Sequence, residues 1–340
     1  MTGARSNPYY DLGMGRLVDG QWTTEWYQPD AEGRFVRPET SFRGWIGDGP
    51  FAPVDGRYHL YVSWACPWAH RTLIARALHG LDHAISISVV DHYMDDQGWR
   101  FDASVAGATA DEVLGARFLR EVYTAADPSF TGRVTVPVLW DTQTRTIVNN
   151  ESRELVRMFN DRFAGVATRE LDLAPAALRG EIDRVIDAIY EPINNGVYKA
   201  GFARSQRAYD EAVGALFEAL DHWDRVLDRR RWLTGERLTE ADIFLYTTLI
   251  RFDLVYHTHF KCNRRRIVDY PNLWGFVREI HQLPGVAATC NFEHIRRHYY
   301  ASHETINPHR IIAIGPELEL DAAHGREAKG GIAGVALLDR

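Results

Sequence analysis

Cys66 is the residue of this chain whose type and position point most directly to chemistry. It follows an apolar run, Tyr58 to Val62, that predicts a β-strand. It precedes Pro67, which suits the first position of a helix because its missing N–H costs nothing there. Cys66 therefore lies at a strand-to-helix turn. Free backbone N–H groups and the helix dipole favour negative charge at such a point, and a thiolate is such a charge.

The four residues Cys66-Pro67-Trp68-Ala69 have the spacing of a Cys-x-x-Cys redox motif, but Ala69 replaces the second cysteine. No internal disulfide can form at this site. The thiol must then take a disulfide partner from outside, and glutathione is the abundant one. The alternative is that Cys66 is a small buried apolar residue, as many free cysteines are. The Cys-Pro pair at a helix start favours the functional interpretation.

Composition limits the classes of protein to which the chain can belong. Its 340 residues suffice for two domains with cores of their own, and its net charge of −7 argues against a nucleic-acid partner. Its three cysteines are too few for a disulfide framework and fit a reducing cytosol. We find no signal peptide and no apolar run near the ~20 residues that span a bilayer. We therefore expect a cytoplasmic protein that does not bind membranes.

Residues 55–165 alternate between strand and helix patterns. The strand before Cys66, the helix after it and the next strand predict a right-handed crossover between parallel strands. A proline within the third strand pattern argues for an edge, a bulge or a cis bond. With the polar helix opening that follows, this order is typical of a thioredoxin-like domain. The predicted strands cover residues 58–62, 85–90, 134–140 and 147–148.

The rest of the chain divides by composition. Residues 1–54 are rich in Gly, Pro and Trp and predict an irregular N-terminal extension, and residues 91–130 predict an insertion with a short helix over 110–123. Residues 170–312 predict an all-helical second domain, and the Gly- and Ala-rich residues 316–340 predict a mobile tail. The helices expected in the second domain cover 178–190, 205–227, a segment opening at the capping-box-like Thr239-Glu240-Ala241-Asp242, and 273–281.

A thioredoxin-like domain followed by a helical domain is the glutathione transferase architecture, and short motifs narrow the resemblance. Cys66-Pro-Trp-Ala-His-Arg71 resembles the active-site signature of the Xi-class transferases, the glutathionyl-hydroquinone reductases. The similarity runs in order and without large gaps over roughly positions 5 to 310. Small departures occur at Val134, Asn149 and Arg153. The other matching stretches are Gly132–Asp141, Asn150–Ser152, Asn194–Lys199, Arg251–Asp253, Phe260–Asn263 and His298–Tyr300.

The resemblance implies a catalytic role for Cys66 as the nucleophile. Tyr198 and Tyr299 match the substrate-binding and catalytic tyrosines of the family, and Tyr256 is a weaker third candidate for substrate binding. A phenol can donate a hydrogen bond to a developing phenolate. The alternative for each is a role in core packing, since the chain has 15 tyrosines.

Glutathione binding is implied for five residues. Val136, before Pro137, is expected to offer its backbone to the cysteinyl part of glutathione, which requires Pro137 to be cis. Glu151 can accept the γ-glutamyl ammonium, and Ser152 at the helix N-terminus can hold its carboxylate. The alternative for this pair is ordinary helix N-terminal chemistry. The remaining two residues are Arg133, for the glycyl carboxylate, and Trp99, which matches a family tryptophan that packs on glutathione.

Other groupings of reactive side chains give weaker signals. Four ligands with supporting partners are typical of zinc sites, and the matching family uses no metal, so we expect none here. We find no phosphate-binding loop and no nucleophile elbow. The residues with loosely metal-like spacing are His257, His259 and Cys262, together with His294 and His298.

The sequence therefore predicts a glutathione transferase fold, α/β plus all-α. Its predicted activity is glutathione-dependent reduction of S-glutathionyl-hydroquinones through a Cys66–glutathione mixed disulfide. Glutathione is a co-substrate, no tightly bound cofactor is expected, and the resemblance implies a homodimer. Two alternatives remain open: an omega-like thioltransferase or dehydroascorbate reductase, and a non-catalytic glutathione-binding module.

Overall fold

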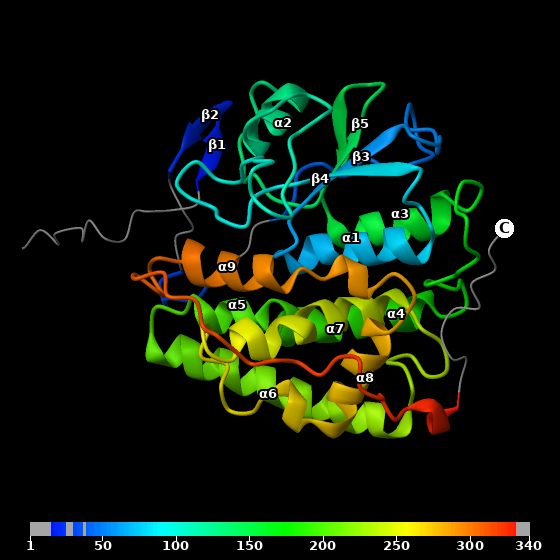
Figure 1. Ribbon diagram of the computed structural model, residues 1–340, viewed down its shortest axis with the longest axis vertical. Coiled ribbons are helices and arrows are strands. Elements are labelled where there is room, and N and C mark those ends of the chain that lie inside the picture. The colour runs from blue at the N-terminus through cyan, green and yellow to red at the C-terminus, as the bar shows by residue number, and fades with distance from the viewer. Residues whose placement is uncertain (1–14, 25–29, 37–38, 331–340) are drawn as a thin grey trace, which may run out of the picture.

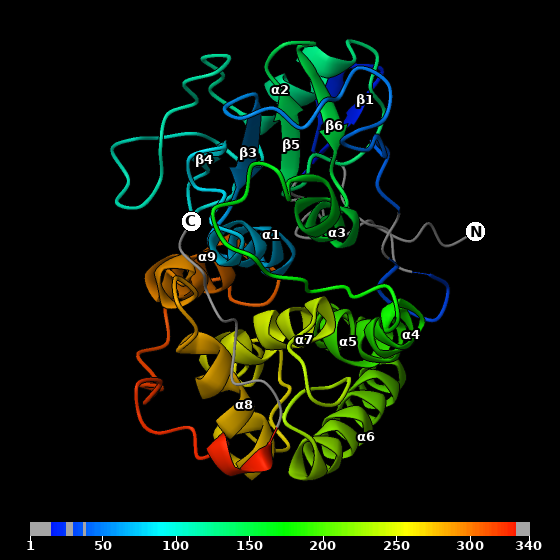
Figure 2. The ribbon, with the colours of Figure 1, turned by 90° about the vertical axis from the view of Figure 1, so that its right-hand side faces the viewer.

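The computed structural model describes residues 15–24, 30–36 and 39–330. A β-sheet occupies one half of the molecule and a bundle of helices occupies the other (Figure 1). Helices α1 (Pro67–Leu78) and α3 (Ser152–Arg162) lie between the sheet and the bundle, as Figures 1 and 2 both show. This arrangement confirms the predicted fold class, a thioredoxin-like part followed by an all-helical part.

The sheet has the strand order β4-β3-β5-β6. The central strand β3 pairs in parallel with β4 and antiparallel with β5, and β5 pairs antiparallel with β6. The chain returns from β3 to β4 through α1, which is the crossover that parallel pairing requires. Every residue of β3 is buried. The bounds are β3 (Tyr58–Val62), β4 (Ile85–Val89), β5 (Val138–Asp141) and β6 (Thr146–Asn149).

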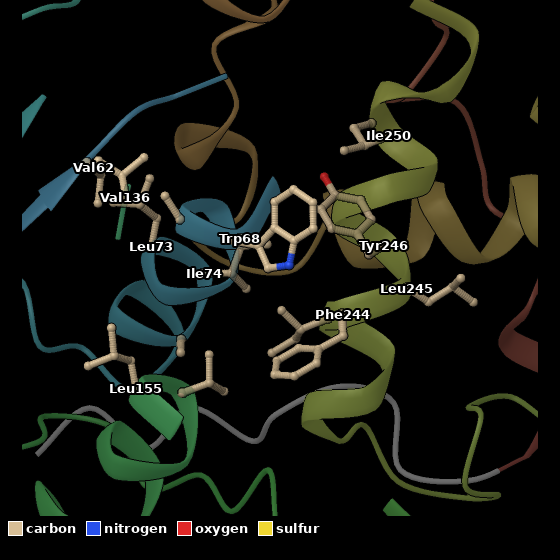
Figure 3. Close-up of a cluster of buried hydrophobic side chains, with 14 of the residues drawn as sticks. Val62, Trp68, Leu73, Ile74, Val136, Leu155, Phe244, Leu245, Tyr246 and Ile250 are labelled. Atoms are coloured by element: carbon tan, nitrogen blue, oxygen red, sulfur yellow. The ribbon is translucent and has the colours of Figure 1, made fainter. Parts of the chain in front are cut away.

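Helix α1 begins at Pro67, as predicted, and Cys66 is its N-cap residue. The helix is buried along almost its whole length because it packs against α3 on one side and against α7 (Glu240–Arg251) on the other. Figure 3 shows Trp68 of α1 pointing toward Tyr246 and Phe244 of α7. This apolar contact fixes the helix that carries the thiol against the helical half.

Helix α7 is the centre of the helical half, and all 12 of its residues are buried. It begins where the sequence predicts, because the backbone N–H of Thr239 donates to the Asp242 carboxylate at 2.8 Å. The other long helices are α4 (Arg179–Ile189), α6 (Gln206–Arg229), α8 (Pro271–His281) and α9 (Phe292–Ser302). Shorter elements are α5 (Gly196–Gly201), two π-helical turns, η2 (Tyr190–Asn194) and η3 (Phe252–Tyr256), and the 3₁₀ turns η4 (Ile267–Asp269) and η5 (Ala287–Thr289).

The N-terminal extension is more regular than predicted. Part of the range 1–54 lies outside the described residues, but β1 (Arg16–Val18) and β2 (Gln21–Thr23) form an antiparallel hairpin. Asp19 and Gly20 make its turn with φ of 49° and 75°. An Asp-Gly pair is a strong signal for such a two-residue turn, and the composition of the segment obscured it.

The insertion helix begins later than predicted. The sequence pattern suggested 110–123, whereas α2 spans Leu119–Ala126. The Asp111 carboxylate accepts hydrogen bonds from the backbone N–H groups of Val113 and Ala116, both at 3.0 Å. These bonds hold the segment in turns, in which an Asp competes with helical bonding.

The tail also differs from the prediction over the part that the structure describes. Arg326 is 2% exposed, and its Nε donates to Glu279 of α8 at 2.8 Å. Gly275 of α8 permits the close approach, since a Cβ there would lie 2.9 Å from the backbone oxygen of His324. A final 3₁₀ turn, η6 (Glu327–Lys329), follows. Residues 316–330 are therefore anchored on α8 rather than free.

Within the described ranges, none of the helices has both the length and the apolar composition needed to cross a membrane.

Candidate active site

The Cys66 thiol lies at the point where the sheet and α1 meet. Its backbone N–H donates to the Ser63 oxygen at 3.2 Å, which closes the turn after β3, and its own oxygen accepts from His70 in the first turn of α1. The side chain is half-buried and makes no cap bond to its own helix. The Sγ atom lies 3.6 Å from the backbone oxygen of Val136. The sulfur is thus accessible beside a helix N-terminus, as a nucleophile requires.

The Val136–Pro137 peptide bond is cis, as the prediction for Val136 required. The bond stands immediately before β5, so the backbone of Val136 faces the sulfur instead of continuing the sheet. The predicted strand 134–140 is correspondingly shorter, and regular pairing begins at Val138.

Glu151 and Ser152 lie at the start of α3, the second helix that packs on the sheet. Glu151 is the N-cap residue, and its Oε1 accepts from the backbone N–H of Arg153 at 3.1 Å. Its Oε2 accepts from the Thr40 hydroxyl at 3.4 Å. Ser152 is buried, and its hydroxyl accepts from Arg71 of α1 at 3.3 Å. The ordinary capping role and an anion-binding role are compatible here, because the first N–H groups of a helix have no partner within it.

A cleft of about 1140 Å³ opens beside Glu151 and Arg71. It lies between the N-terminal segment, α3, α4 and α5, and Cys66 is not among its lining residues. The side chain of Arg153, one of the departures from the family pattern, lines it and pairs with Asp187 at 2.7 Å and Asp183 at 3.0 Å on α4. That residue therefore joins α3 to the helical half.

Three tyrosines meet on the helical side of the thiol. The hydroxyls of Tyr198 and Tyr299 are hydrogen-bonded to each other, that of Tyr256 lies 2.9 Å from Tyr299, and that of Tyr256 lies 3.5 Å from Tyr198. Tyr198 comes from α5, Tyr256 from η3 and Tyr299 from α9. All three predicted tyrosines are thus brought together. We call this group the tyrosine triad.

Burial keeps the tyrosine triad protonated. It raises the pKa of Tyr198 and of Tyr299 well above the ordinary value of a phenol, and it also raises the pKa of Tyr256. The charge of Cys66 raises the pKa of Tyr198 and Tyr256 further. The phenols can therefore donate hydrogen bonds throughout the neutral pH range.

Aromatic rings surround the tyrosine triad. Trp68, two residues after the thiol, lies 5.0 Å from Tyr198 between ring centroids and is 7% exposed. Phe260 contacts Tyr198 at 5.4 Å and Tyr299 at 5.6 Å. Trp68 is therefore both part of the core and a neighbour of the triad. A flat aromatic ligand fits such surroundings.

Trp99 and Arg133 lie in the segments between β4 and β5. Trp99 is 7% exposed and stacks on His298 with a centroid distance of 4.9 Å, next to Tyr299 in α9. Arg133 is half-buried on the stretch that leads to the cis bond. Trp99 thus lies near Tyr299 of the tyrosine triad, and Arg133 lies on the segment that leads to Val136.

Three of the histidines with metal-like spacing, His259, His294 and His298, are hydrogen-bonded to protein groups. His259 Nε2 lies 3.0 Å from His303 Nδ1, and His294 Nε2 donates to the backbone oxygen of Ala106 at 2.7 Å. His298 Nδ1 donates to the backbone oxygen of His92 at 2.9 Å. Over residues 15–24, 30–36 and 39–330, no three His, Cys, Asp or Glu side chains are grouped so that they could hold a metal ion.

Arg71 and Arg251 are site residues to which the sequence interpretation gave no role. Arg71 donates to Ser152 and, at 3.1 Å, to Asn194 of η2. Arg251 donates to the backbone oxygens of Trp64 and Ala65, both at 2.9 Å, just before the thiol. Both arginines lie within the matching motifs, but only the folded chain shows what they contact.

Comparison with known proteins places this fold and site in a family. The model of the glutathione S-transferase N-terminal domain matches residues 65–162, and that of the C-terminal domain matches residues 206–279. The glutathionyl-hydroquinone reductase YqjG of Escherichia coli is 53% identical over 94% of this chain and 100% of its own length. The glutathionyl-hydroquinone reductase PcpF of Sphingobium chlorophenolicum is 50% identical over 89% of this chain and 96% of its own length.

Solved structures agree with the sequence matches. The Xi-class glutathione transferase of Natrialba magadii superimposes with a TM-score of 0.89, at 51% identity, over 95% of this chain and 98% of that one. The glutathione-bound structure of E. coli YqjG superimposes with a TM-score of 0.83, at 55% identity, over 85% of this chain and 97% of that one.

The fold and the site define a glutathione transferase with a cysteine at the start of its first thioredoxin-domain helix. Within that superfamily, the chain belongs to the Xi class, the glutathionyl-hydroquinone reductases. The resemblance that the sequence motifs gave is confirmed.

Proposed function

We propose that this protein is a glutathione-dependent reductase that converts S-glutathionyl-hydroquinones to hydroquinones. The observation that carries the proposal is a half-buried Cys66 thiol against the Val136 backbone, followed two residues later by Trp68, whose ring packs on Tyr198 of a triad of buried, protonated tyrosines. One side of the thiol suits glutathione, and the other suits a flat phenolic ring. The names of the E. coli and Sphingobium relatives support the same activity.

In the first half-reaction, the thiolate of Cys66 attacks the glutathione sulfur of the substrate. The substrate reacts in its keto form, in which the ring carbon that carries the sulfur has already taken up the proton. The bond between sulfur and this carbon breaks, and its electron pair restores the aromatic ring and leaves a negative charge on a ring oxygen. That oxygen takes up a proton, hydroquinone leaves, and Cys66 remains as a mixed disulfide with glutathione.

In the second half-reaction, the thiolate of a second glutathione attacks the mixed disulfide. Oxidised glutathione leaves and the Cys66 thiolate is restored, so the ring gains the two electrons that the two glutathione sulfurs lose. No resolving cysteine is needed, which fits Ala69 at the position where a Cys-x-x-Cys motif has its second thiol.

The tyrosine triad is assigned to the hydroquinone. As the ring takes the electron pair, negative charge develops on its oxygens, and phenol groups that stay protonated can donate hydrogen bonds to them. Tyr198 and Tyr299 are given this role together with proton supply, and Tyr256 binds substrate beside them. Their mutual hydrogen bonds orient all three hydroxyls before substrate arrives.

The glutathione part is assigned to the sheet side of the site. The Val136 backbone is to bind the cysteinyl unit, and Glu151 and Ser152 at the start of α3 are to bind the γ-glutamyl ammonium and carboxylate. Arg133 is proposed for the glycyl carboxylate and Trp99 for a packing contact with glutathione. Glutathione is the co-substrate, and we propose no tightly bound cofactor.

Intact-protein mass spectrometry tests the proposal directly. Adding a glutathionyl-hydroquinone without free glutathione should add one glutathionyl group, mapped to Cys66, with release of hydroquinone. Turnover should also be faster on this substrate than on a small model disulfide. Faster turnover of the disulfide would favour an omega-like thioltransferase or dehydroascorbate reductase. No adduct, with Cys66 still open to alkylation, would favour a non-catalytic glutathione-binding module.

Three further properties are part of the proposal. We propose that the protein acts in the reducing cytoplasm and assembles as a homodimer, and light scattering after gel filtration tests the second point. The domain division stays as predicted from sequence: a thioredoxin-like domain at 55–165 with its insertion at 91–130, and a helical domain at 170–312.

A further inference from the structure

Arg251 is a buried arginine that joins the helical half of the molecule to the turn of the thiol. It ends α7 and is fully buried. Its Nε donates to the Ala65 oxygen at 2.9 Å, and one terminal nitrogen donates to the Trp64 oxygen at 2.9 Å. The other terminal nitrogen donates to Thr247 at 2.8 Å and meets His70 Nδ1 at 2.9 Å.

The hydrogen bonds of Arg251 fix the proton of His70. Arginine has only donors, so Nδ1 of His70 must accept and the ring proton must be on Nε2. Nε2 then donates to the Thr289 hydroxyl at 2.8 Å, which itself donates to the Val286 oxygen at 2.6 Å. Burial, and next the charge of Arg251, hold the pKa of His70 well below its ordinary value. His70 is therefore a neutral hydrogen-bond acceptor, and it does not neutralise the positive charge of Arg251.

Among the residues that the structure describes, no carboxylate forms an ion pair with Arg251. Its hydrogen-bond partners are three backbone oxygens and a neutral imidazole. Two other buried arginines do have carboxylate partners: Arg57 pairs with Asp141, and Arg326 pairs with Glu279. Burying a charge without a counter-charge is costly. The position of the Arg251 guanidinium beside the candidate active site therefore indicates that a negative group forms in that site during the reaction.

The titratable groups around Arg251 come from both sides of the site. Its charge opposes the effect of burial on the tyrosine triad, because it lowers the pKa of Tyr256 and Tyr299 while burial raises it. The same chain segment continues from Arg251 directly into η3, which carries Tyr256. The groups on which the charge of Arg251 acts are His70, Tyr246, Tyr256, Cys290, His298 and Tyr299.

We propose that Arg251 is a positioning residue of the reductase reaction. It holds the Trp64–Ala65 turn from which Cys66 projects, and it supplies a fixed positive charge on the side of the tyrosine triad, where the anionic hydroquinone is proposed to form. The proposal rests on the proposed function for its effect on turnover. Its effect on the thiol is independent of that function, because alkylation of Cys66 requires no substrate.

The test compares Arg251→Gln, Arg251→Lys and the unchanged chain. The rate of Cys66 alkylation by iodoacetamide is measured at pH 7, and the modified residue is identified by peptide mapping. Both variants lose the planar guanidinium that holds the turn, so their alkylation rates should differ at least about threefold from that of the unchanged chain. Arg251→Lys keeps a positive charge, so its reductase kcat should fall about tenfold, whereas that of Arg251→Gln should fall about a hundredfold.

Arg326→Met is the matched control, because it removes a buried arginine on α8, away from the thiol. It should lower the melting temperature without changing the alkylation rate or the reductase kcat. A folded Arg251→Gln protein with the same kcat as Arg251→Lys would overturn the assignment of the charge. If Arg251→Gln does not fold, an Arg251→Lys protein with unchanged kcat would overturn the positioning role. Loss of reductase activity in the unchanged chain would overturn the proposed function alone.

Discussion

The sulfur of Cys66 lies 3.6 Å from the backbone oxygen of Val136, although 70 positions separate the two residues in the chain. One belongs to the turn between β3 and α1, and the other belongs to the cis bond before β5. Since β3 and β5 are neighbours in the sheet, their adjoining ends bring these two segments together. Strand pairing therefore places the proposed nucleophile beside the backbone that is proposed to bind glutathione.

Cys66→Ser should abolish reduction of glutathionyl-hydroquinones. A serine hydroxyl does not form the mixed disulfide, so a loss of at least about a thousandfold in kcat/KM is expected. Steady-state assay of hydroquinone release measures the loss, and mass spectrometry should show no glutathionyl adduct. Cys262→Ala is the control, since burial raises the pKa of that thiol and keeps it unreactive. Equal losses in both variants would contradict the assignment.

The cysteine and its turn could be predicted from sequence because their signals are local. A strand pattern, a Cys-Pro pair and a helical pattern follow one another within a few residues, and the structure places α1 at Pro67 as predicted. The Asp19-Gly20 hairpin also had a local signal, which the Gly- and Pro-rich composition around it obscured.

Tyr198→Phe should lower the reductase kcat by roughly tenfold to a hundredfold. The ring and its packing remain, but one phenol that would donate to the developing oxyanion is lost. The rate with a small model disulfide should stay nearly constant, since that reaction expels no aromatic ring. Both rates are measured on the same preparation.

Tyr246→Phe is the matched control for the triad. It removes another buried phenol, whose oxygen lies 3.1 Å from His281 and is hydrogen-bonded outside the triad. Its kcat should change less than twofold. If Tyr198→Phe slowed both substrates equally, the triad would have a structural role only.

The tyrosine triad could not be assembled from sequence patterns alone. Tyr198, Tyr256 and Tyr299 are separated by 58 and 43 positions, and two π-helical turns precede or contain two of them. A π-turn changes which residues share a helix face, so the 3.6-residue period does not predict where those side chains point. The family resemblance indicated which tyrosines belong to the site, and only the folded structure shows that their hydroxyl groups meet.

The anchored tail was missed for a related reason. Its composition is Gly- and Ala-rich, and the contact depends on one side chain, Arg326, whose partner Glu279 is 47 positions earlier. Neither residue is unusual within its own segment. A buried ion pair between distant residues leaves no periodic signal in the sequence.

Glu151→Gln should raise the KM for the glutathionyl-hydroquinone about tenfold with little change in kcat. The carboxylate proposed to accept the γ-glutamyl ammonium becomes a neutral amide, and a hydrogen bond to a charged group contributes about 1.5–3 kcal/mol. The KM is measured in the steady state at saturating glutathione, because the site proposed around Glu151 binds the glutathionyl part of the substrate.

Glu154→Gln controls for loss of a charge on the same helix, because Glu154 pairs with Arg43. Its KM should change less than threefold. A tenfold rise in both variants would mean that the general charge of α3, and not Glu151 itself, governs glutathione binding.

Arg57→Met should destabilise the fold by about 3–5 kcal/mol at pH 7, because it leaves the buried Asp141 without its partner. Burial alone would raise the pKa of Asp141, but the hydrogen bonds from Arg57 and Thr144 hold it below its ordinary value. The pair therefore stabilises the protein above the unfolded pKa of about 3.9, and that stability is lost as the pH falls below it.

In the variant, Asp141 can take up a proton in the folded state. The deficit in unfolding free energy relative to the unchanged chain should therefore shrink between pH 7 and pH 4. Urea unfolding at both pH values measures this deficit. The half-exposed pair of Arg266 and Asp269 is the control, because Arg266→Met should leave the unfolding curve nearly unchanged. A deficit that stays constant with pH would show that Asp141 is not the group left unpaired.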